Sequence, residues 1–393
     1  MGLELLAKLD DNPENTQLEL VLRTSLAHAS SVTQGYGATE VEQAYSRARE
    51  LCRQGGSNIQ LGPVLWGLWR FYLIRSDLKV ARELSQQLLE LAQNAQDGAL
   101  LVGSHLALGT TFVNLGDFES AKNHFEQGLS LYDPKQQNTY LSLYGSDPNV
   151  THRSFNAWAL WSLGYPDLAL ATAREAVSLA EELRHPETLC FATFFNAWVH
   201  QLRREPDETL KYAETTIGLA RKNGIAQWLA FGSSLLGWAL AEQRFVNDGI
   251  EQMRNTLATY SAIGSEISRP HFLGLLAEAL KKNDQIDEGR LVVADALNLV
   301  DSTDQRYYES ELYRLKGELL ALTGDADEAQ MCLQKSIEVA RRQKAKSFEL
   351  RAATSLLHLS KRAGSTLAEV YTSFTEGFDT ADLKNARALL NAL

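Results

Sequence analysis

The sequence predicts an all-α fold: a single α-solenoid over residues 1–393, built of helix hairpins with a 40-residue period. The first observation behind this prediction is a set of small residues at equal spacing. Five of the six intervals between them are 40 residues long and one is 48. Fixed self-similarity at roughly 20–50 residues is the signature of a solenoid, in which each unit contacts only its neighbours. The positions are Ala81, Ala121, Ala169, Thr209, Gly249, Gly289 and Ala329.

A second set of residues has the same spacing and lies at the start of each second helix. Asp and Asn side chains accept hydrogen bonds from the free N–H groups of a helix start and favour its positive end. We therefore expect these residues to cap the second helices rather than to act in catalysis. They are Asp167, Asp207, Asn247, Asp287 and Asp327.

The spacing inside one unit, residues 102–138, predicts two helices that approach each other closely. Gly116-Asp117 separates two stretches with helical periodicity. Gly109 and Ala121 have almost no side chain, so the helices can touch there, and Phe125 fills the space beside them. This arrangement resembles the tetratricopeptide repeat, which implies a right-handed solenoid, although the usual period of that repeat is about 34 residues. The positions that carry the resemblance are Leu108, Gly109, Phe112, Gly116, Ala121, Phe125 and Gly128.

The same register divides the chain into about eight to nine units. Residues 134–149 carry the eight-residue excess and are expected to form an inserted loop on one rim, either solvated or available to a partner through Tyr140 and Tyr144. Met1–Asp11 is expected to be the tail of a helix without its partner, as if the chain began inside a longer solenoid. Residues 379–393 are expected to form a C-terminal capping helix. The units span about 14–54, 59–96, 100–133 and, for units four to eight, 150–343, and a last partial unit starts at Ser347.

Composition excludes several classes of partner. The chain holds 49 acidic and 38 basic residues, a net charge of −11, which disfavours nucleic acid and an anionic membrane surface. No apolar run is long enough to span a membrane, and the first residues lack the features of a signal peptide. Three widely spaced cysteines (Cys52, Cys190 and Cys332) are typical of reduced thiols in a cytoplasmic protein.

Motifs that would indicate catalysis are missing from the sequence. It holds no phosphate-binding glycine loop, no Cys-x-x-Cys, no His-Glu-x-x-His and no Gly-x-Ser-x-Gly. Its eight histidines have no metal-ligand spacing, and we expect His200 to be buried and hydrogen-bonded. The sequence therefore predicts a protein that is not itself an enzyme and that needs no cofactor or metal.

A stripe of tryptophans is the best candidate for a binding surface. In the repeat register, Trp158, Trp198 and Trp238 occupy the same groove-facing position of three consecutive units. Large exposed aromatic residues indicate a partner, and Trp is enriched among binding hot spots. The alternative is that these rings pack between neighbouring first helices, and Asn156 and Asn196 are open to the same two interpretations. The candidate groove residues are Trp158, Trp161, Phe194, Trp198, Phe231, Trp238, His271 and Glu278, and the candidate loop contacts are Tyr140 and Tyr144.

Several stretches resemble one family in particular: bacterial class III adenylate/guanylate cyclases with a central AAA/STAND-type ATPase module. The similarity is to the C-terminal repeat region of these proteins, and it covers nearly the whole chain except about residues 360–369. The cyclase carboxylates and the ATPase phosphate loop lie upstream in that family, so no catalytic residue carries over. The stretches are Gln34–Cys52, Leu143–Pro148, Asn156–Asp167, Glu311–Glu318 and Phe374–Leu383.

The resemblance implies a sensor or scaffold, the regulatory repeat region of a signalling ATPase-cyclase. Its concave groove would bind a peptide, a protein or a small effector. The alternative is a free-standing tetratricopeptide interaction protein that has lost the catalytic modules. An enzyme with an unrecognised site is the third hypothesis.

Overall fold

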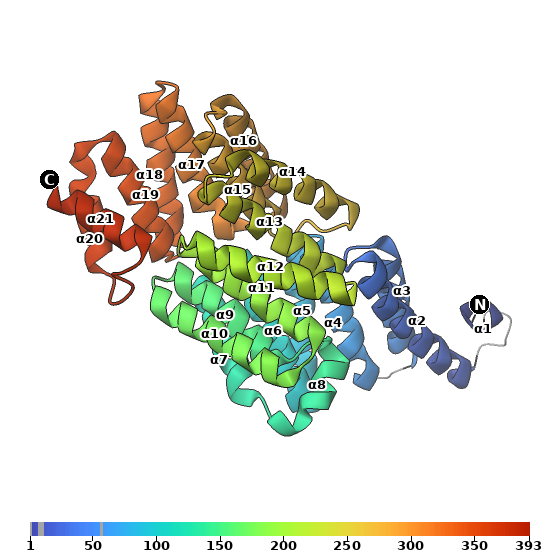
Figure 1. The fold of residues 1–393 in the computed structure, drawn as a ribbon. Coiled ribbons are helices and arrows are strands. Elements are labelled where there is room, and N and C mark those ends of the chain that lie inside the picture. The colour runs from blue at the N-terminus through green and yellow to red at the C-terminus, as the bar shows by residue number, and fades with distance from the viewer. Residues whose placement is uncertain (1, 7–11, 56–57) are drawn as a thin grey trace.

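The computed structural model describes residues 2–6, 12–55 and 58–393, and its regular elements are all helices (Figure 1). A short helix α1 (Gly2–Leu6) precedes a series of antiparallel hairpins. The hairpins are α2 (Pro13–Gln34) with α3 (Thr39–Gly55), α4 (Asn58–Ile74) with α5 (Leu78–Ala95), α6 (Gly98–Asn114) with α7 (Phe118–Leu131), α9 (Pro148–Ser162) with α10 (Pro166–Leu183), α11 (Pro186–Leu202) with α12 (Pro206–Asn223), α13 (Ala226–Glu242) with α14 (Val246–Ala262), α15 (Arg269–Lys282) with α16 (Ile286–Thr303), α17 (Glu309–Leu322) with α18 (Ala326–Arg342), and α19 (Lys346–Leu359) with α20 (Gly364–Thr372). The predicted all-α solenoid of hairpins is confirmed.

The small-residue ladder marks the closest approach of the two helices in a hairpin. Ala81, Ala121 and Ala169 are fully buried. In the α13–α14 hairpin, a Cβ added to Gly249 would lie 2.4 Å from the carbonyl oxygen of Gly237. A methyl group does not fit at that distance, so Gly is required at this crossing.

The turns inside the hairpins repeat the same period in their backbone angles. The turn residue has a positive φ in seven hairpins, at intervals of 40, 48, 40, 40, 40 and 40 residues. Three of these residues are glycine, which adopts this conformation without steric cost, and four are not. The residues are Ser76, Gly116, Gly164, Arg204, Arg244, Asp284 and Gly324.

The Asp and Asn residues that repeat every 40 residues do not cap the second helices, so that prediction is wrong. Each helix begins two residues earlier than expected, and the N-cap positions of α10, α12, α14, α16 and α18 make no side-chain capping bond. Asp167 instead accepts from the Arg203 guanidinium at 3.1 Å, and Asp207 accepts from the Gln243 side-chain amide at 2.5 Å. These side chains therefore tie one unit to the turn of the next.

The insertion is folded inward rather than forming the expected rim loop. Pro134–Gln136 make a 3-10 turn, and α8 (Gln137–Tyr144) packs against α4 and α6. Tyr140 and Tyr144 are buried, and the Tyr144 hydroxyl donates to the Ala99 carbonyl at 2.7 Å. The aromatic rings of this segment make it part of the core.

The superhelix is wound tightly enough to contact itself. The loop before α15 reaches the end of α4, where the N–H groups of Glu266 and Ile267 donate to the Ile74 carbonyl at 2.8 and 3.1 Å. Farther along, the Ser347 hydroxyl donates to the Trp161 carbonyl at 2.5 Å. The concave groove expected from the sequence is therefore closed by contacts between distant units.

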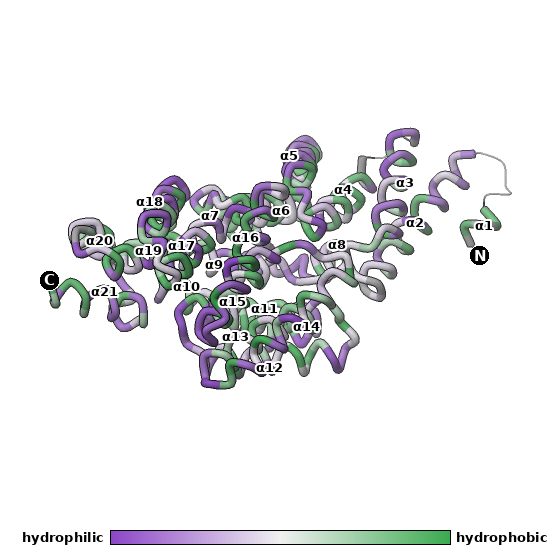
Figure 2. Tube along the Cα trace, turned by 90° about the horizontal axis from the view of Figure 1, so that it is seen from above, coloured by the Kyte–Doolittle hydropathy of each residue, from purple (hydrophilic) through white to green (hydrophobic). Residues whose placement is uncertain are grey.

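Because of this closure, the first helices of the hairpins form the interior. Figure 2 shows α4 and α11 largely hydrophobic, whereas α5 and α18, second helices of their hairpins, carry many hydrophilic residues. One core of buried residues runs from Leu20 to Phe348.

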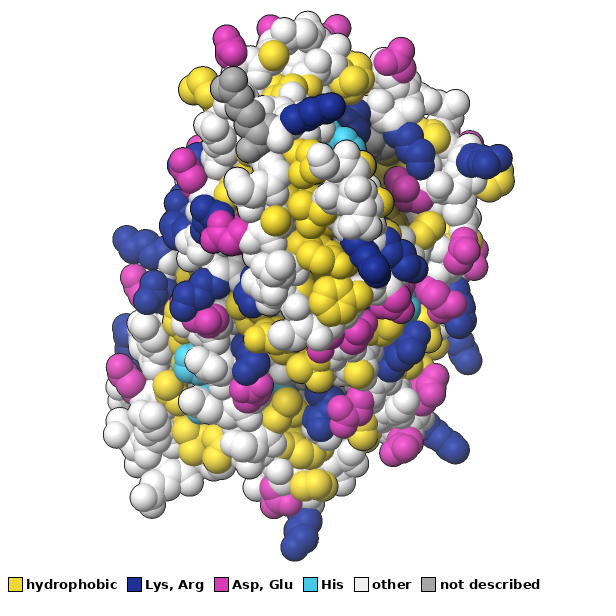
Figure 3. Space-filling model, turned by 90° about the vertical axis from the view of Figure 1, so that its left-hand side faces the viewer, with side chains coloured by type: hydrophobic (Ala, Val, Ile, Leu, Met, Phe, Trp, Pro, Cys, Tyr) yellow, Lys and Arg dark blue, Asp and Glu magenta, His cyan; other side chains and the backbone are white. Residues whose placement is uncertain are grey.

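The C-terminal end has a smaller core of its own. Helix α21 (Ala381–Asn391) packs on α19 and α20 and buries Leu383 and Ala386. Seen from this side, the surface carries charges of both signs around hydrophobic patches (Figure 3). Among the described residues, no helix is long and apolar enough to cross a membrane.

Candidate ligand-binding cleft

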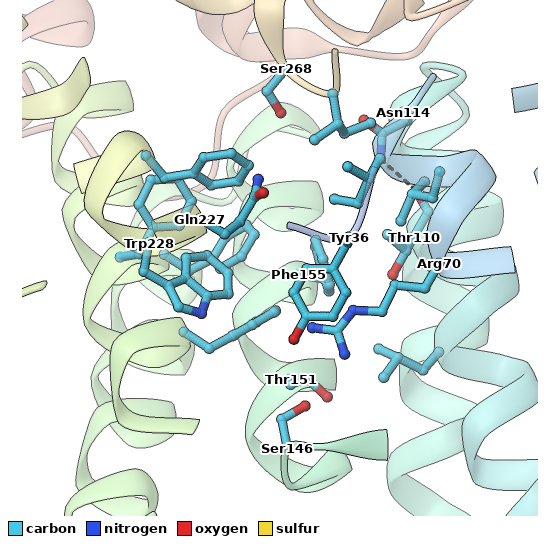
Figure 4. Close-up of a pocket in the computed structure, with 18 of the residues that line it drawn as sticks. Tyr36, Arg70, Thr110, Asn114, Ser146, Thr151, Phe155, Gln227, Trp228 and Ser268 are labelled. Atoms are coloured by element: carbon cyan, nitrogen blue, oxygen red, sulfur yellow. Dashed lines mark hydrogen bonds between the residues drawn. The ribbon is translucent and has the colours of Figure 1, made fainter. Parts of the chain in front are cut away.

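Five consecutive first helices line one aromatic cleft in the interior of the superhelix. Helices α4, α6, α9, α11 and α13 each contribute side chains, and Tyr36 from the first turn and Tyr144 from α8 complete the wall (Figure 4). The space between the lining atoms, including the open mouth, is about 820 Å³. Ile74 and Ile267 line it from the two sides of the superhelical closure, so the cleft exists only because the superhelix closes.

Aromatic rings supply most of the wall, and they pack on one another in tilted and edge-to-face arrangements. The ring centroids of Phe155 and Phe195 lie 4.7 Å apart, and those of Phe191 and Trp228 lie 5.1 Å apart. Such arrangements are favoured by the ring quadrupoles and hold the rings in fixed positions. The wall is therefore rigid and apolar.

Arg70 is the one charged residue among the described residues that line this cleft. Its guanidinium carbon lies 3.6 Å from the centre of the Tyr36 ring, a cation–π contact. It donates to the Tyr144 carbonyl at 3.4 Å, and its distance to the Glu187 carboxylate is 3.8 Å. Burial raises the pKa of the Tyr36 hydroxyl to about 12 although the Arg70 charge opposes this shift, so the phenol stays protonated near neutral pH.

Several polar atoms in the wall have no hydrogen-bond partner within the described protein. A buried polar atom without a partner is costly, so such atoms mark places where a ligand or water completes the bonding. Their residues are at least nine-tenths buried. The atoms are Oγ1 of Thr110, Oδ1 of Asn114, Nε1 of Trp158, Nε1 of Trp198 and Oε1 of Gln227.

Half of the residues predicted for a groove or loop site line this cleft, and half do not. Those that line it are Trp158, Phe194, Trp198, Phe231 and Tyr144. The others lie elsewhere: Trp161, Trp238, His271 and Tyr140 are buried, and the Glu278 side chain is 14% exposed.

The residues outside the cleft have structural partners. Trp161 packs against Phe348 and lies under the Arg351 guanidinium, whose carbon is 4.8 Å from the indole. Trp238 donates to Glu278 at 3.2 Å. His271 stacks on Tyr308 with a centroid distance of 4.1 Å. The Tyr140 hydroxyl accepts from the Asp133 N–H at 3.2 Å. Each of the five side chains therefore has a partner within the protein.

Glu278 belongs to a buried ionic cluster that joins units five, seven, eight and nine. Arg204 contacts Glu278 at 2.5 Å and Glu311 at 3.5 Å, and Arg314 contacts Glu311 at 2.7 Å. Arg204, followed by Arg314 and Lys281, holds the pKa of Glu278 down at about 2 in spite of its burial. Glu278, predicted as a groove residue, is therefore neutralised by cations of the protein itself.

Two other expectations concern histidine and asparagine. His200 is buried and its Nδ1 lies 2.5 Å from the Glu205 carboxylate, as expected. Asn196 is buried, and neither atom of its side-chain amide has a hydrogen-bond partner within the described protein. Of the two interpretations open from the sequence, the structural one therefore has no hydrogen bond to support it.

The sequence-based list missed much of the wall, although the repeat register would have found part of it. The groove-facing positions applied to Trp158, Trp198 and Trp238 also select Trp66 and Arg70 in α4 and Leu106 and Thr110 in α6. Tyr36 is in a turn, outside that register.

Three segments match models of the tetratricopeptide repeat: residues 102–134, 150–175 and 310–343. An uncharacterized protein of Rhizobium meliloti (strain 1021) is 23% identical over 364 residues. The match covers 91% of this chain but 35% of that protein, so the chain spans about a third of its relative's length.

Solved structures show the same kind of fold. A Rap protein complexed with competence and sporulation factor is 12% identical with a TM-score of 0.54, over 90% of this chain and all of that one. NprR in complex with its cognate peptide NprX is 12% identical with a TM-score of 0.53, over 95% and 98% of the two chains. The fold is thus a tetratricopeptide-like helical solenoid, and the tetratricopeptide part of the sequence resemblance is confirmed. The link to cyclase and ATPase modules stays a prediction.

Proposed function

We propose that this chain is a sensor scaffold that binds a small effector or a peptide in the aromatic cleft. The observation that carries the proposal is the rigid apolar cleft whose buried polar atoms lack partners. Ligand pockets are typically concave and mostly apolar, with a few polar groups that fix orientation. Binding by a solenoid of this fold also accords with the two similar structures, which were solved with a peptide or a factor bound.

The cleft also offers a route from binding to a change of shape. Its lining includes Ile74 and Ile267, which meet at the superhelical closure. A ligand that bridges these two sides favours the closed superhelix over an opened one by its difference in affinity for the two states. We propose that this shift regulates a signalling ATPase or cyclase module in a longer protein. The length of the Rhizobium meliloti relative supports the longer protein.

Filling the cleft tests the proposal. Thr110 is buried in its wall, and Thr110→Phe places a ring in the space that a ligand would occupy. Trp238→Phe is the control, because Trp238 is a large buried aromatic outside the cleft. A library of small organic acids and short peptides is screened by ligand-observed NMR against the full chain and both variants. Ligands that bind the full chain and Trp238→Phe but not Thr110→Phe support the proposal. Ligands that Thr110→Phe binds equally well contradict it.

A native gene product with a mass of 43.7 kDa, the mass of this chain alone, would contradict the longer signalling protein. It would favour the free-standing interaction protein instead.

A further inference from the structure

We infer that the cleft takes an aromatic carboxylate with a hydrogen-bond donor at its far end. The carboxylate binds Arg70 and Tyr36, and the ring lies among the aromatic side chains. This inference rests on the proposed function and names the class of ligand. The same chemistry is present in a free aromatic acid and in the C-terminal residue of a peptide.

Arg70 and Tyr36 form an anion site that the protein leaves open. A guanidinium has five N–H donors, and Arg70 gives one of them to a protein acceptor within 3.5 Å. Its side chain remains 22% exposed. Figure 4 shows the Tyr36 hydroxyl beside the guanidinium, and this phenol is held in its protonated, donating form. A guanidinium and a phenol hydroxyl are thus available as donors in the same part of the cleft.

The charge of the ligand follows from the charge of the site. Arg70 is the one cation among the described lining residues. The Glu187 carboxylate compensates its charge only in part, because the two groups are 3.8 Å apart. A single carboxylate matches that cation and forms charge-assisted bonds with it. A phosphate dianion would bring a second negative charge into an apolar cleft, where an unpaired charge is costly.

A second cleft gives a ligand access to the anion site from another side. It shares Tyr36, Trp66, Arg70 and Tyr144 with the first, and it holds about 630 Å³ including its mouth. The guanidinium thus lies at the junction of the two clefts. A ligand can enter with its apolar body in one cleft while its carboxylate stays near water.

The far wall supplies an acceptor for a donor on the ligand. The Gln227 side-chain amide donates to Ser265 at 3.2 Å, which leaves its Oε1 without a partner. On the same side of the cleft as Arg70 in Figure 4, Asn114 donates to the Thr110 carbonyl at 2.8 Å and leaves its Oδ1 without a partner. Figure 4 shows Gln227 entering the cleft from the side opposite Arg70. A hydroxyl or ring N–H at the far end of the ligand would satisfy the Gln227 oxygen.

The experiment compares matched probes by isothermal titration calorimetry on the full chain near neutral pH. The probes are 3-(4-hydroxyphenyl)propionate, its primary amide, N-acetyl-Ala-Tyr and the amide of that dipeptide. Each acid is expected to bind at least tenfold more tightly than its amide. Tighter binding of 3-(4-hydroxyphenyl)propionate would identify the ligand as a free aromatic acid. Tighter binding of N-acetyl-Ala-Tyr would identify it as the C-terminal residue of a peptide.

Variants separate the charge from the fold. Arg70→Gln is expected to lose at least tenfold in affinity for the acids and little for the amides, and Tyr36→Phe to lose severalfold. Arg174→Gln, which removes an exposed positive charge on α10, is the control and should bind as the unchanged chain does. Retained helical circular dichroism shows that each variant is folded.

Equal affinity for acid and amide, or unchanged acid binding by Arg70→Gln, would overturn the carboxylate inference. So would the absence of binding by every probe. A different result would contradict the proposed function: Thr110→Phe binds every ligand as well as the unchanged chain does.

Discussion

The carbonyl oxygen of Ile74 accepts the backbone N–H of Glu266 at 2.8 Å, and this bond joins the end of α4 to the loop before α15. The two residues belong to the second unit and to the entrance of the seventh. Their contact turns an open spiral into a closed one. It explains why tryptophans placed on a concave face by their spacing are buried rather than exposed.

Glycine at position 37 is required for this closure, which leads to the first prediction. A Cβ on Gly37 would lie 2.1 Å from the carbonyl oxygen of Gly264, and backbone atoms cannot move away without opening the closure. We expect Gly37→Ala to lower the free energy of unfolding by about 1–3 kcal/mol, the usual cost of overpacking. We also expect it to increase the radius of gyration in small-angle X-ray scattering.

Gly98→Ala is the matched control, because a Cβ at Gly98 meets no atom within 4 Å. It should leave both the unfolding free energy and the radius of gyration almost unchanged. If Gly37→Ala behaves like this control, the closure tolerates the methyl group and its tight fit is not a determinant of the shape.

Much of the fold could be predicted from the period, and the residues show why. Ala81, Ala121 and Gly249 report a local crossing of two helices, which depends on nearby sequence alone. The unit boundaries follow from such crossings. The Gly37–Gly264 contact instead depends on the small rotation between successive units, summed over several of them, and no local pattern encodes that sum.

The same distinction, between local spacing and long-range closure, separates the cleft residues that the sequence predicted from those that it did not. Phe194 and Trp198 follow the register of the repeat, so spacing alone places them on the concave side. Trp238 follows it too, yet it donates to Glu278 and lies outside the cleft. Tyr36 reaches the cleft from a turn only after the superhelix closes.

The second prediction concerns acid stability. Arg204 above all holds the pKa of Glu278 down at about 2, below its ordinary value of 4.5. The unfolded chain therefore binds more protons between these values, so Glu278 stabilises the fold above about pH 4.5 and loses this contribution as pH falls toward 2. Glu278→Gln should lower the unfolding free energy near pH 7 by about 3 kcal/mol, because it leaves buried Arg204 poorly compensated.

Urea unfolding at pH 7, 4 and 3 measures this effect. The difference between Glu278→Gln and the unchanged chain should shrink from pH 7 to pH 3, since below about pH 4.5 this carboxyl group binds a proton in the unfolded chain and not yet in the folded one. Glu242→Gln is the control, because Glu242 pairs with Lys282 at 3.3 Å near the surface and is expected to contribute little. A difference that stays constant over this range would show that Glu278 keeps its ordinary pKa.

The third prediction compares Arg204 and Arg244, which occupy the same turn position of consecutive units with φ of 62° and 80°. Side chains with a Cβ are strained there, whereas Gly is not. The exposed Arg244 has no hydrogen-bonding or ionic partner among the described residues, so Arg244→Gly should raise the unfolding free energy by up to about 1 kcal/mol. Arg204 contacts Glu278 and Glu311, so Arg204→Gly should lower it by about 3 kcal/mol in spite of the relieved backbone. Urea unfolding of the two variants at pH 7 gives both values. Loss of stability in Arg244→Gly would mean that the left-handed turn costs arginine little at this position.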